Sequence, residues 1–154
     1  MTTAARGMYW EDFKVGDTIR TPSRTITSTD IVNFACLSGD FNEVHTNWEY
    51  CKTTPFGEPI AHGPLVYAIA AGLQYASGIN DGTLIALLQI DAWRMLVPVK
   101  HGDTICAELH VLETKATSKP DKGTVKMKRR FVRSDGVVVQ EMEVTMLYKR
   151  RPAE

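Results

Sequence analysis

An α+β fold, in which an antiparallel sheet curls around one buried helix, is the fold class that the sequence predicts. The periodicity of the hydrophobic residues carries this prediction. Apolar residues recur at helical spacing before Gly82 and alternate with polar residues after it, as in strands with one wet face. The segment from Pro59 to Asn80 contains no Asp, Glu, Lys or Arg, which indicates a helix inside the protein. Together, the two patterns favour a sheet packed on a single helix.

We expect the central helix to run from Pro64 to Ala76. Proline suits the first position of a helix because its missing N–H would have no partner there. Apolar side chains lie around the whole circumference of this helix: Leu65, Val66, Ala68, Ile69, Ala71, Leu73 and Ala76. A helix that is apolar on every side is expected to be surrounded by protein. Its apolar centre is far shorter than the ~20 residues of a membrane span, so no membrane segment is predicted.

Four strands are predicted after the central helix. The first is one long strand over Leu84–Pro98, and the others cover the alternating runs 105–111, 125–131 and 142–146. Between the last two, Ser-Asp-Gly at 134–136 predicts a tight hairpin.

A basic run from Lys119 to Arg133 overlaps the third of these strands and contains seven Lys and Arg residues. We interpret it as the solvated face of a strand whose lysines discourage pairing at a sheet edge. The alternative is that this face binds the phosphates of an anionic ligand.

The first part of the chain is expected to hold one strand and two helices. The strand covers Thr18–Ile26. A capping box of Thr27 and Asp30 then starts a helix over Ser28–Ser38, which ends at a glycine. A short helix over Trp48–Lys52 follows, with an asparagine as its cap.

The length of 154 residues indicates one domain, expected to cover residues 1–154 with a core over about 9–148. Lys and Arg number 18 and Asp and Glu also number 18, and this balance argues against a nucleic-acid or membrane-surface binder. Three cysteines without a CxxC spacing form neither a disulfide framework nor a zinc motif, and they suit a reducing cytosol. Because the N-terminal segment lacks the apolar run of a secretory signal, a cytoplasmic location is expected.

The densest polar cluster is the predicted loop over residues 39–47. Asp40 and His45 are five residues apart, which misses the i, i+4 spacing of one helix face. In an irregular loop both side chains can still turn towards one water molecule and exchange its protons. The alternative is that Asp40 shapes a turn after the preceding helix and that His45 lies on the surface.

A second candidate is the Ala-His-Gly-Pro segment at residues 61–64. The helix that begins at Pro64 directs its unpaired amides and positive dipole end towards Gly63. Because glycine lets a ligand carbonyl approach its N–H, Gly63 is a candidate oxyanion site, and an ordinary helix cap is the alternative. The two candidate segments also hold a carboxylate and two imidazoles, but their spacing matches no metal-ligand motif, so we predict no metal.

Two segments, SGDFNEVHTN and PIAHGPL, together resemble the MaoC-like, or (R)-specific, enoyl-CoA hydratase family. In that family a Gly-Asp-x-Asn-Pro-(Ile/Leu)-His-x-Asp loop precedes a His-Gly pair that opens the central helix. A less specific similarity continues into TLIALLQIDAWRMLVPVKHGDTI. Three residues depart from the family's pattern, where Pro, Asp and, in several members, Ser are usual: Glu43, Asn47 and Ala68.

The resemblance implies a hot-dog fold, assembled as a homodimer or a dimer of dimers, that acts on a CoA thioester. The implied reaction is reversible syn addition of water to a trans-2-enoyl-CoA, without a metal or redox cofactor. Asp40 and His45 would be the catalytic pair. Gly63 would hold the thioester oxygen through its N–H, with His62 and Asn42 as further substrate-site residues.

Two other functions remain open for this fold. An acyl-CoA thioesterase would use a carboxylate to activate water against the carbonyl carbon. Such an enzyme more often carries its acidic residue on the central helix, and the segment from Pro64 to Ala76 has none. A non-catalytic acyl-CoA-binding subunit is the third reading, and the intact Asp–His pair argues against it.

Overall fold

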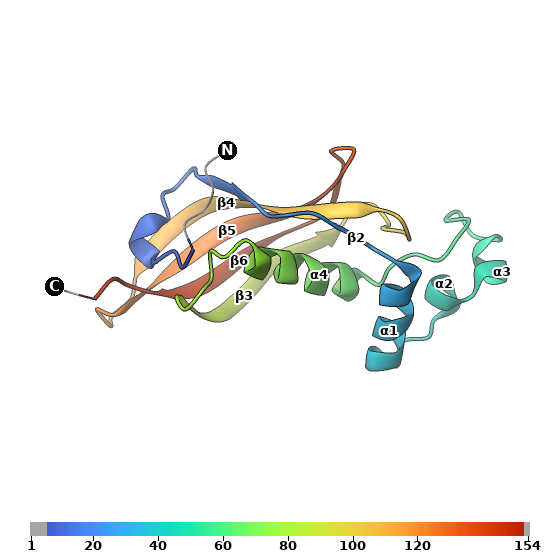
Figure 1. The fold of residues 1–154 in the computed structure, drawn as a ribbon, viewed down its shortest axis with the longest axis horizontal. Helices are drawn as coiled ribbons and strands as arrows, with labels where there is room; N and C mark the ends of the chain where they lie inside the picture. Colours follow the sequence, from blue (N-terminus) through green and yellow to red (C-terminus); the bar gives the residue numbers. More distant parts are fainter. Residues whose placement is uncertain (1–5, 153–154) are drawn as a thin grey trace.

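The protein, seen in a computed structural model that describes residues 6–152, forms an antiparallel sheet with helix α4 along one face (Figure 1). The ends of the predicted 1–154 domain lie outside the described residues. The elements, in chain order, are η1 (Trp10–Asp12), β1 (Thr18–Arg20), β2 (Arg24–Thr25), α1 (Ser28–Ser38), α2 (Glu43–Thr46), α3 (Trp48–Cys51), α4 (Gly63–Ala76), β3 (Leu84–Met95), β4 (Thr104–Ala116), β5 (Lys122–Arg133) and β6 (Val138–Lys149). In Figure 1, α1, α2 and α3 gather at one end of the sheet.

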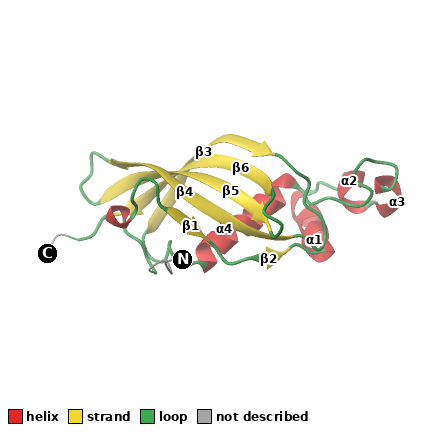
Figure 2. Ribbon diagram, turned by 90° about the horizontal axis from the view of Figure 1, so that it is seen from above, coloured by secondary structure: helices red, strands yellow, loops and turns green. Residues whose placement is uncertain are grey.

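The six strands pair in the order β1-β4-β5-β6-β3, and β2 also pairs with β4. All pairings are antiparallel, as predicted. Strand β5 is central, and its lysines pair with glutamates of β6: Lys126 Nζ lies 2.6 Å from Glu143 Oε2, and Lys128 Nζ lies 3.0 Å from Glu141 Oε2. The interpretation of the basic run as a protected edge was therefore wrong. Strand β3 is at the edge instead, as Figure 2 shows.

The predicted runs 105–111, 125–131 and 142–146 lie inside the longer strands β4, β5 and β6, while two other predicted strands differ more from the structure. The strand predicted over Thr18–Ile26 is broken into β1 and β2, because Pro22 lies between them and has no N–H for the ladder. The strand predicted over Leu84–Pro98 ends at Met95 and shifts its register against β6 at three places. These shifts bend β3 away from a regular edge.

Helix α4 buries one side against the sheet. Its core residues are Leu65, Val66, Ile69, Ala70 and Leu73. On the other side, exposed residues recur at helical spacing, namely Pro64, Ala68, Gly72, Tyr75 and Ala76. The expectation that protein surrounds this helix was wrong for the described chain, because the sheet covers one face and no second layer lies on the other. A membrane-spanning helix is not found among the described residues, since none is both long and apolar enough.

Candidate active site

The loop that follows α1 positions Asp40. Thr27 and Asp30 form the predicted capping box at the start of α1, and Gly39 ends the helix with a φ of 77°, in the left-handed region. This turn places Asp40 directly after the helix. The backbone N–H of Asn42 donates a hydrogen bond of 3.2 Å to Asp40 Oδ1, which leaves Oδ2 free to face the imidazoles.

His45 lies on the short helix α2, which the sequence analysis treated as loop. The side chain of Asn42 caps this helix by accepting from the N–H of Val44. His45 Nδ1 lies 2.7 Å from the backbone carbonyl oxygen of Ile60. Because a carbonyl can only accept, Nδ1 carries the proton and Nε2 presents a lone pair. That lone pair is available to take a proton from water.

Two of the residues that depart from the family's pattern contact one another at α2. Glu43 is the first residue of α2, and its Oε1 accepts a hydrogen bond of 3.0 Å from Asn47 Nδ2. The first turn of a helix favours an acidic residue as well as proline, so Glu43 permits the same local structure. Asn47 also caps α3, as predicted.

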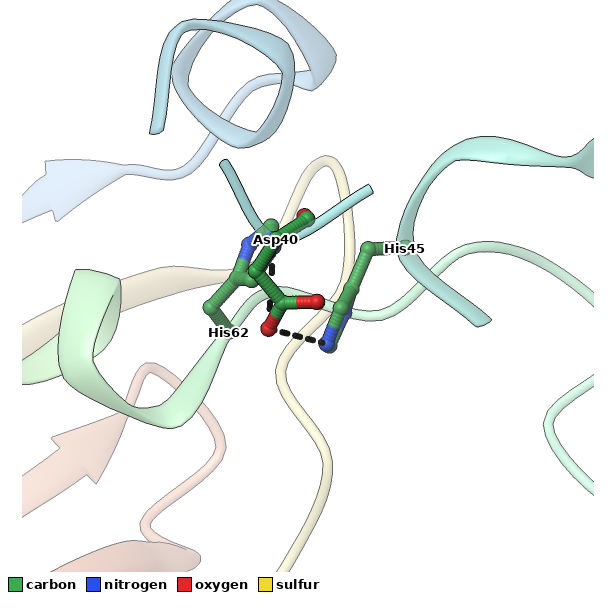
Figure 3. Close-up of side chains that lie close together, drawn as sticks. All are labelled: Asp40, His45 and His62. Carbon is green, nitrogen blue, oxygen red and sulfur yellow. Dashed lines mark hydrogen bonds and ion pairs between the residues drawn. The ribbon is translucent and has the colours of Figure 1, made fainter. Parts of the chain in front are cut away.

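The acid and the two imidazoles converge at the start of α4, as Figure 3 shows. Asp40 Oδ2 lies 4.0 Å from His45 Nε2 and 3.9 Å from His62 Nε2. Both distances exceed a hydrogen bond, so a water molecule can bridge the carboxylate and His45. The prediction that Asp40 and His45 turn towards one point is confirmed in geometry. Their exposure differs, because the side chain of Asp40 is 54% exposed and that of His45 is 13% exposed.

His62 supports Asp40 and His45 through one hydrogen bond and one ring contact. Its side chain is 2% exposed, and its Nε2 donates a hydrogen bond of 2.9 Å to the backbone carbonyl of Asp40. The rings of His45 and His62 stack with their centroids 3.7 Å apart. His62 therefore fixes both catalytic candidates, one through its backbone and the other through its ring.

Gly63 begins α4 next to this pair. Among the described residues no recorded hydrogen bond uses its N–H, while its carbonyl accepts from Gln140 Nε2 at 3.0 Å. The thioether of Met95 packs directly where a side chain on Gly63 would lie. Since a methionine side chain is flexible, it can move aside for a ligand carbonyl.

A cavity of about 360 Å³ has both His45 and Gly63 in its lining. Apolar side chains form much of the remaining wall, among them Phe56, Val66 and Met95. Asp40 is not among the lining residues. A larger groove of about 840 Å³ lies near the C-terminal segment, but its lining contains no histidine.

The three side chains of the site also resemble a metal site, because one ligand atom from each lies within 4.8 Å of the others. His62 Nε2 donates to a carbonyl and so has no lone pair for a metal. Nδ1 of the same ring has no hydrogen-bond partner but is buried, so Asp40 Oδ2 and His45 Nε2 are left as the ligand atoms that face one another, which is fewer than a stable transition-metal site uses.

Asn42 and Cys51 lie close to the site without facing it. Asn42 is exposed and serves as the cap of α2. Burial, followed by the nearby charge of Glu43, raises the pKa of the Cys51 thiol, which therefore stays protonated. A thiolate nucleophile is thus not offered at this position.

Gln140 is a site residue that the sequence analysis missed. It lies on the inward face of β6 with Met142 and Val144, and its side chain joins Gly63 to Trp93, whose Nε1 donates to Gln140 Oε1 at 3.0 Å. The signal that could have found it is a polar residue at a position where the alternation of the strand predicts an apolar, inward-facing side chain.

Comparison with known protein families places the chain among MaoC-like proteins. The model of the family described as MaoC like domain matches residues 12–130. A 3-hydroxybutyryl-CoA dehydratase of Methylorubrum extorquens is 41% identical over 113 residues, which cover 73% of this chain and 69% of the relative. An (R)-specific enoyl-CoA hydratase of Rhodospirillum rubrum is 34% identical over 103 residues, covering 67% of this chain and 69% of the relative. Protein MaoC of Klebsiella aerogenes is 42% identical over 101 residues, 66% of this chain and only 30% of that longer protein.

Solved structures share the same architecture. A protein described as a monoamine oxidase regulatory protein from Archaeoglobus fulgius matches with a TM-score of 0.86 and 35% identity, over 97% of this chain and 99% of that one. An unliganded R-hydratase from Pseudomonas aeruginosa matches with a TM-score of 0.75 and 30% identity, over 96% and 93% of the two chains. A Mycobacterium tuberculosis protein described as having a double hot-dog fold has a TM-score of 0.84 at 18% identity, over 96% of this chain and 46% of that one. The predicted hot-dog fold is confirmed.

Proposed function

Because the chain belongs to the MaoC-like domain family, we propose that it is an (R)-specific enoyl-CoA hydratase, which also dehydrates 3-hydroxyacyl-CoA in the reverse direction. One observation carries the proposal. Asp40 Oδ2 and His45 Nε2 face each other 4.0 Å apart, so a water molecule beside them can hydrogen-bond to both, and His45 shares a cavity with Gly63 at the start of α4. An acid–imidazole pair beside a polarising amide is what hydration of a conjugated thioester requires.

In this mechanism the N–H of Gly63 donates to the thioester oxygen. The positive end of the α4 dipole acts in the same direction, so negative charge that develops on this oxygen is stabilised as the β-carbon is attacked. The carbonyl of Gly63 is held by Gln140, which fixes the orientation of this first turn. The amide therefore needs no rearrangement when the enolate forms.

The water molecule is held between Asp40 and His45. As its oxygen bonds to the β-carbon, the lone pair on His45 Nε2 takes one of its protons, while Asp40 accepts a hydrogen bond and orients it. The proton then passes to the α-carbon of the enolate. The enoyl thioester and one water molecule are consumed and His45 returns to its starting form, while delivery of both groups from one side gives syn addition.

We propose that no redox cofactor takes part, because addition of water transfers no electrons between reactants. We also propose that no metal takes part, because the Gly63 N–H would polarise the thioester and Asp40 and His45 would activate the water. CoA enters as part of the substrate. The free cysteines Cys36, Cys51 and Cys106 agree with the reducing cytoplasm that we propose as its location.

We also propose a homodimer formed along β3. This strand is at the sheet edge, and several of its large apolar side chains are exposed: Ile85, Leu87, Leu88, Trp93 and Met95. An edge of this kind favours pairing with a second strand. A dimer of dimers would need a further contact, for which the exposed side of α4 is available.

The test is an assay of the purified chain with a panel of trans-2-enoyl-CoA thioesters. Loss of enoyl absorbance, with formation of the (R)-3-hydroxyacyl product, is the expected result. Release of free thiol is measured in parallel, because a thioesterase would produce it and a hydratase would not. Thiol release without loss of the enoyl chromophore would contradict the proposal, and so would no turnover with every thioester tested.

A further inference from the structure

A second cavity, of about 340 Å³, lies between the C-terminal half of α4 and strand β3. Its lining includes the apolar side chains of Ala71, Leu84 and Leu87, together with Gln74 and Arg129. The proposed catalytic reaction uses none of these residues. We call this cavity the Arg129 pocket.

Arg129 is buried on the core side of the sheet. The residue is 2% exposed and is flanked on the same face of β5 by Met127 and Phe131, both fully buried. Its Nη2 donates a hydrogen bond of 2.5 Å to Gln74 Oε1, while its Nε and Nη1 have no partner. Two donors of a buried guanidinium that lines the pocket therefore lack acceptors.

No carboxylate of residues 6–152 forms an ion pair with Arg129. The polar side chains around it are neutral: Gln74 and Asn80 are amides that line the same pocket, and burial raises the pKa of the Tyr148 hydroxyl well above its ordinary value, so that this group stays protonated. The ring of Tyr67 lies 5.7 Å from the guanidinium carbon and makes a cation–π contact, which supplies no hydrogen-bond acceptor. Burial also lowers the pKa of Arg129, although an arginine remains charged at any physiological pH. The pocket thus holds one positive charge without a negative one.

Such an arrangement is unfavourable for the empty protein, because a buried charge needs an opposite charge or full hydrogen bonding. A methionine would fill a similar volume in the sheet without this cost. The charge is accounted for if the pocket receives an anion that supplies the missing acceptors.

The Arg129 pocket and the catalytic cavity lie along one face of α4. Gly63, Tyr67, Ala71 and Gln74 follow each other at intervals of three or four residues, which places them on one stripe of the helix. The two ends of this stripe are about 16 Å apart at a rise of ~1.5 Å per residue. Tyr67 lies on this stripe between its two ends, and its ring packs against that of Trp93 with the centroids 5.3 Å apart, so an acyl chain that reaches both cavities requires these rings to turn aside.

We propose that the Arg129 pocket binds a carboxylate at the far end of the substrate's acyl chain, so that the preferred substrates are ω-carboxylated enoyl-CoA thioesters. The inference rests on the proposed function, because the thioester end must lie at Gly63. A single guanidinium among apolar side chains matches one negative charge on an apolar chain. A phosphate, with two charges and more acceptors, would leave most of its oxygens without donors in this pocket.

The test compares trans-2-enoyl-CoA thioesters that end in a methyl group with ω-carboxylated thioesters of the same chain length. We expect wild-type protein to hydrate one or more of the carboxylated series with the higher kcat/KM. In Arg129→Met this kcat/KM should fall by about 10- to 100-fold, the value of a hydrogen bond to a charged group, while that for the methyl series changes little. Arg130→Met is the matched control, because Arg130 is the next residue and faces the other side of the sheet.

A second variant keeps the test independent of the folding of Arg129→Met. Asn80 lines the same pocket and its Oδ1 accepts a hydrogen bond of 2.8 Å from the Tyr148 hydroxyl, so Asn80→Asp can place a carboxylate in the pocket while keeping the shape and the acceptor of the original side chain. It should remove the preference for carboxylated substrates in the same way. Equal turnover of both series, unchanged in both variants, would overturn the inference and leave the hydratase proposal intact.

A binding measurement distinguishes failure of the hydratase proposal from failure of carboxylate binding in the Arg129 pocket. If no thioester is hydrated, the proposed function fails, and stabilisation by glutarate or adipate is then measured by thermal unfolding. Stabilisation of wild-type protein that Arg129→Met abolishes would support carboxylate binding in the pocket and contradict its assignment to an acyl chain. Absence of stabilisation in that case would overturn carboxylate binding altogether.

Discussion

At the first turn of α4 the polar groups hold one another, whereas near its last turn a charged group is buried without an opposite charge. His62 donates to the carbonyl of Asp40, and Gln140 donates to the carbonyl of Gly63. At the other end, Gln74 satisfies only part of the Arg129 guanidinium. The first end is a rigid support for a reaction, and the second is complete only with an anion bound. One helix thus joins a preorganised site to a ligand-dependent one.

The largest effect is expected from substitutions of the acid–imidazole pair at the first end of α4. Asp40→Asn removes the charge that orients the water, and His45→Ala removes the lone pair that accepts its proton. Each substitution should lower kcat for enoyl-CoA hydration by about 10²- to 10⁴-fold, the usual contribution of a general acid–base group. Steady-state kinetics on folded variants, checked by circular dichroism, provide the measurement.

Two substitutions far from the cavity serve as controls for these variants. Asp121→Asn alters a carboxylate that is 70% exposed, and His110→Ala alters an imidazole on β4. Both should leave kcat unchanged. Activity near the wild-type value in Asp40→Asn or His45→Ala would refute the assigned roles.

The two ends of α4 also differ in how well the sequence predicts them. The first end is built from short segments in which local signals agree, such as the capping box before α1, the glycine after it and the proline of α4. These signals predicted α1, whereas the convergence of Asp40 with His45 was one of two interpretations that the loop left open. The family resemblance then supplied the expected roles.

The second end depends on strand register, which the local sequence does not specify. Arg129 belongs to the buried phase of β5, between Met127 and Phe131, yet it was interpreted as part of a solvated basic run. Which strand lies at the sheet edge is equally a property of the whole topology. For that reason the protective role given to the lysines of β5 was wrong, and the break at Pro22 and the helix α2 were not predicted.

A second prediction tests whether the first end is as rigid as its hydrogen bonds indicate. His62→Leu removes the donor to the carbonyl of Asp40 and the ring that stacks on His45. We expect the free energy of unfolding to fall by about 1–3 kcal/mol, because a partly buried carbonyl loses its partner. Urea unfolding followed by fluorescence measures this value, and hydration should also slow as Asp40 loses its position. An unfolding free energy equal to that of wild type would show that His62 does not hold the loop.

At the second end of α4, near Arg129, the free energy of unfolding is not expected to fall. Arg129→Met replaces a buried, partly unpaired charge with an apolar side chain, which is expected to be neutral or to stabilise the empty protein by about 1 kcal/mol. Arg130→Met, on the solvated face, should change stability by less. A loss of more than about 2 kcal/mol in Arg129→Met would indicate that the hydrogen bond to Gln74 stabilises the fold and would remove the contrast between the two ends.

The smallest effect is expected at the capping box that starts α1. This helix ends just before Asp40 and so helps to position it. Burial raises the pKa of Asp30, but hydrogen bonds from Thr27 and the charge of Arg24 outweigh it and hold this pKa below its ordinary value. A group with a lowered pKa in the folded state stabilises the protein above its unfolded pKa, and this contribution is lost as the pH falls through the folded value. Asp30→Asn should therefore be about 0.5–1 kcal/mol less stable than wild type at pH 7, and this difference should shrink below about pH 3.9. Thermal unfolding of both proteins across this pH range measures it, and a difference that stays constant down to pH 2 would mean that the carboxylate charge of Asp30 does not stabilise α1.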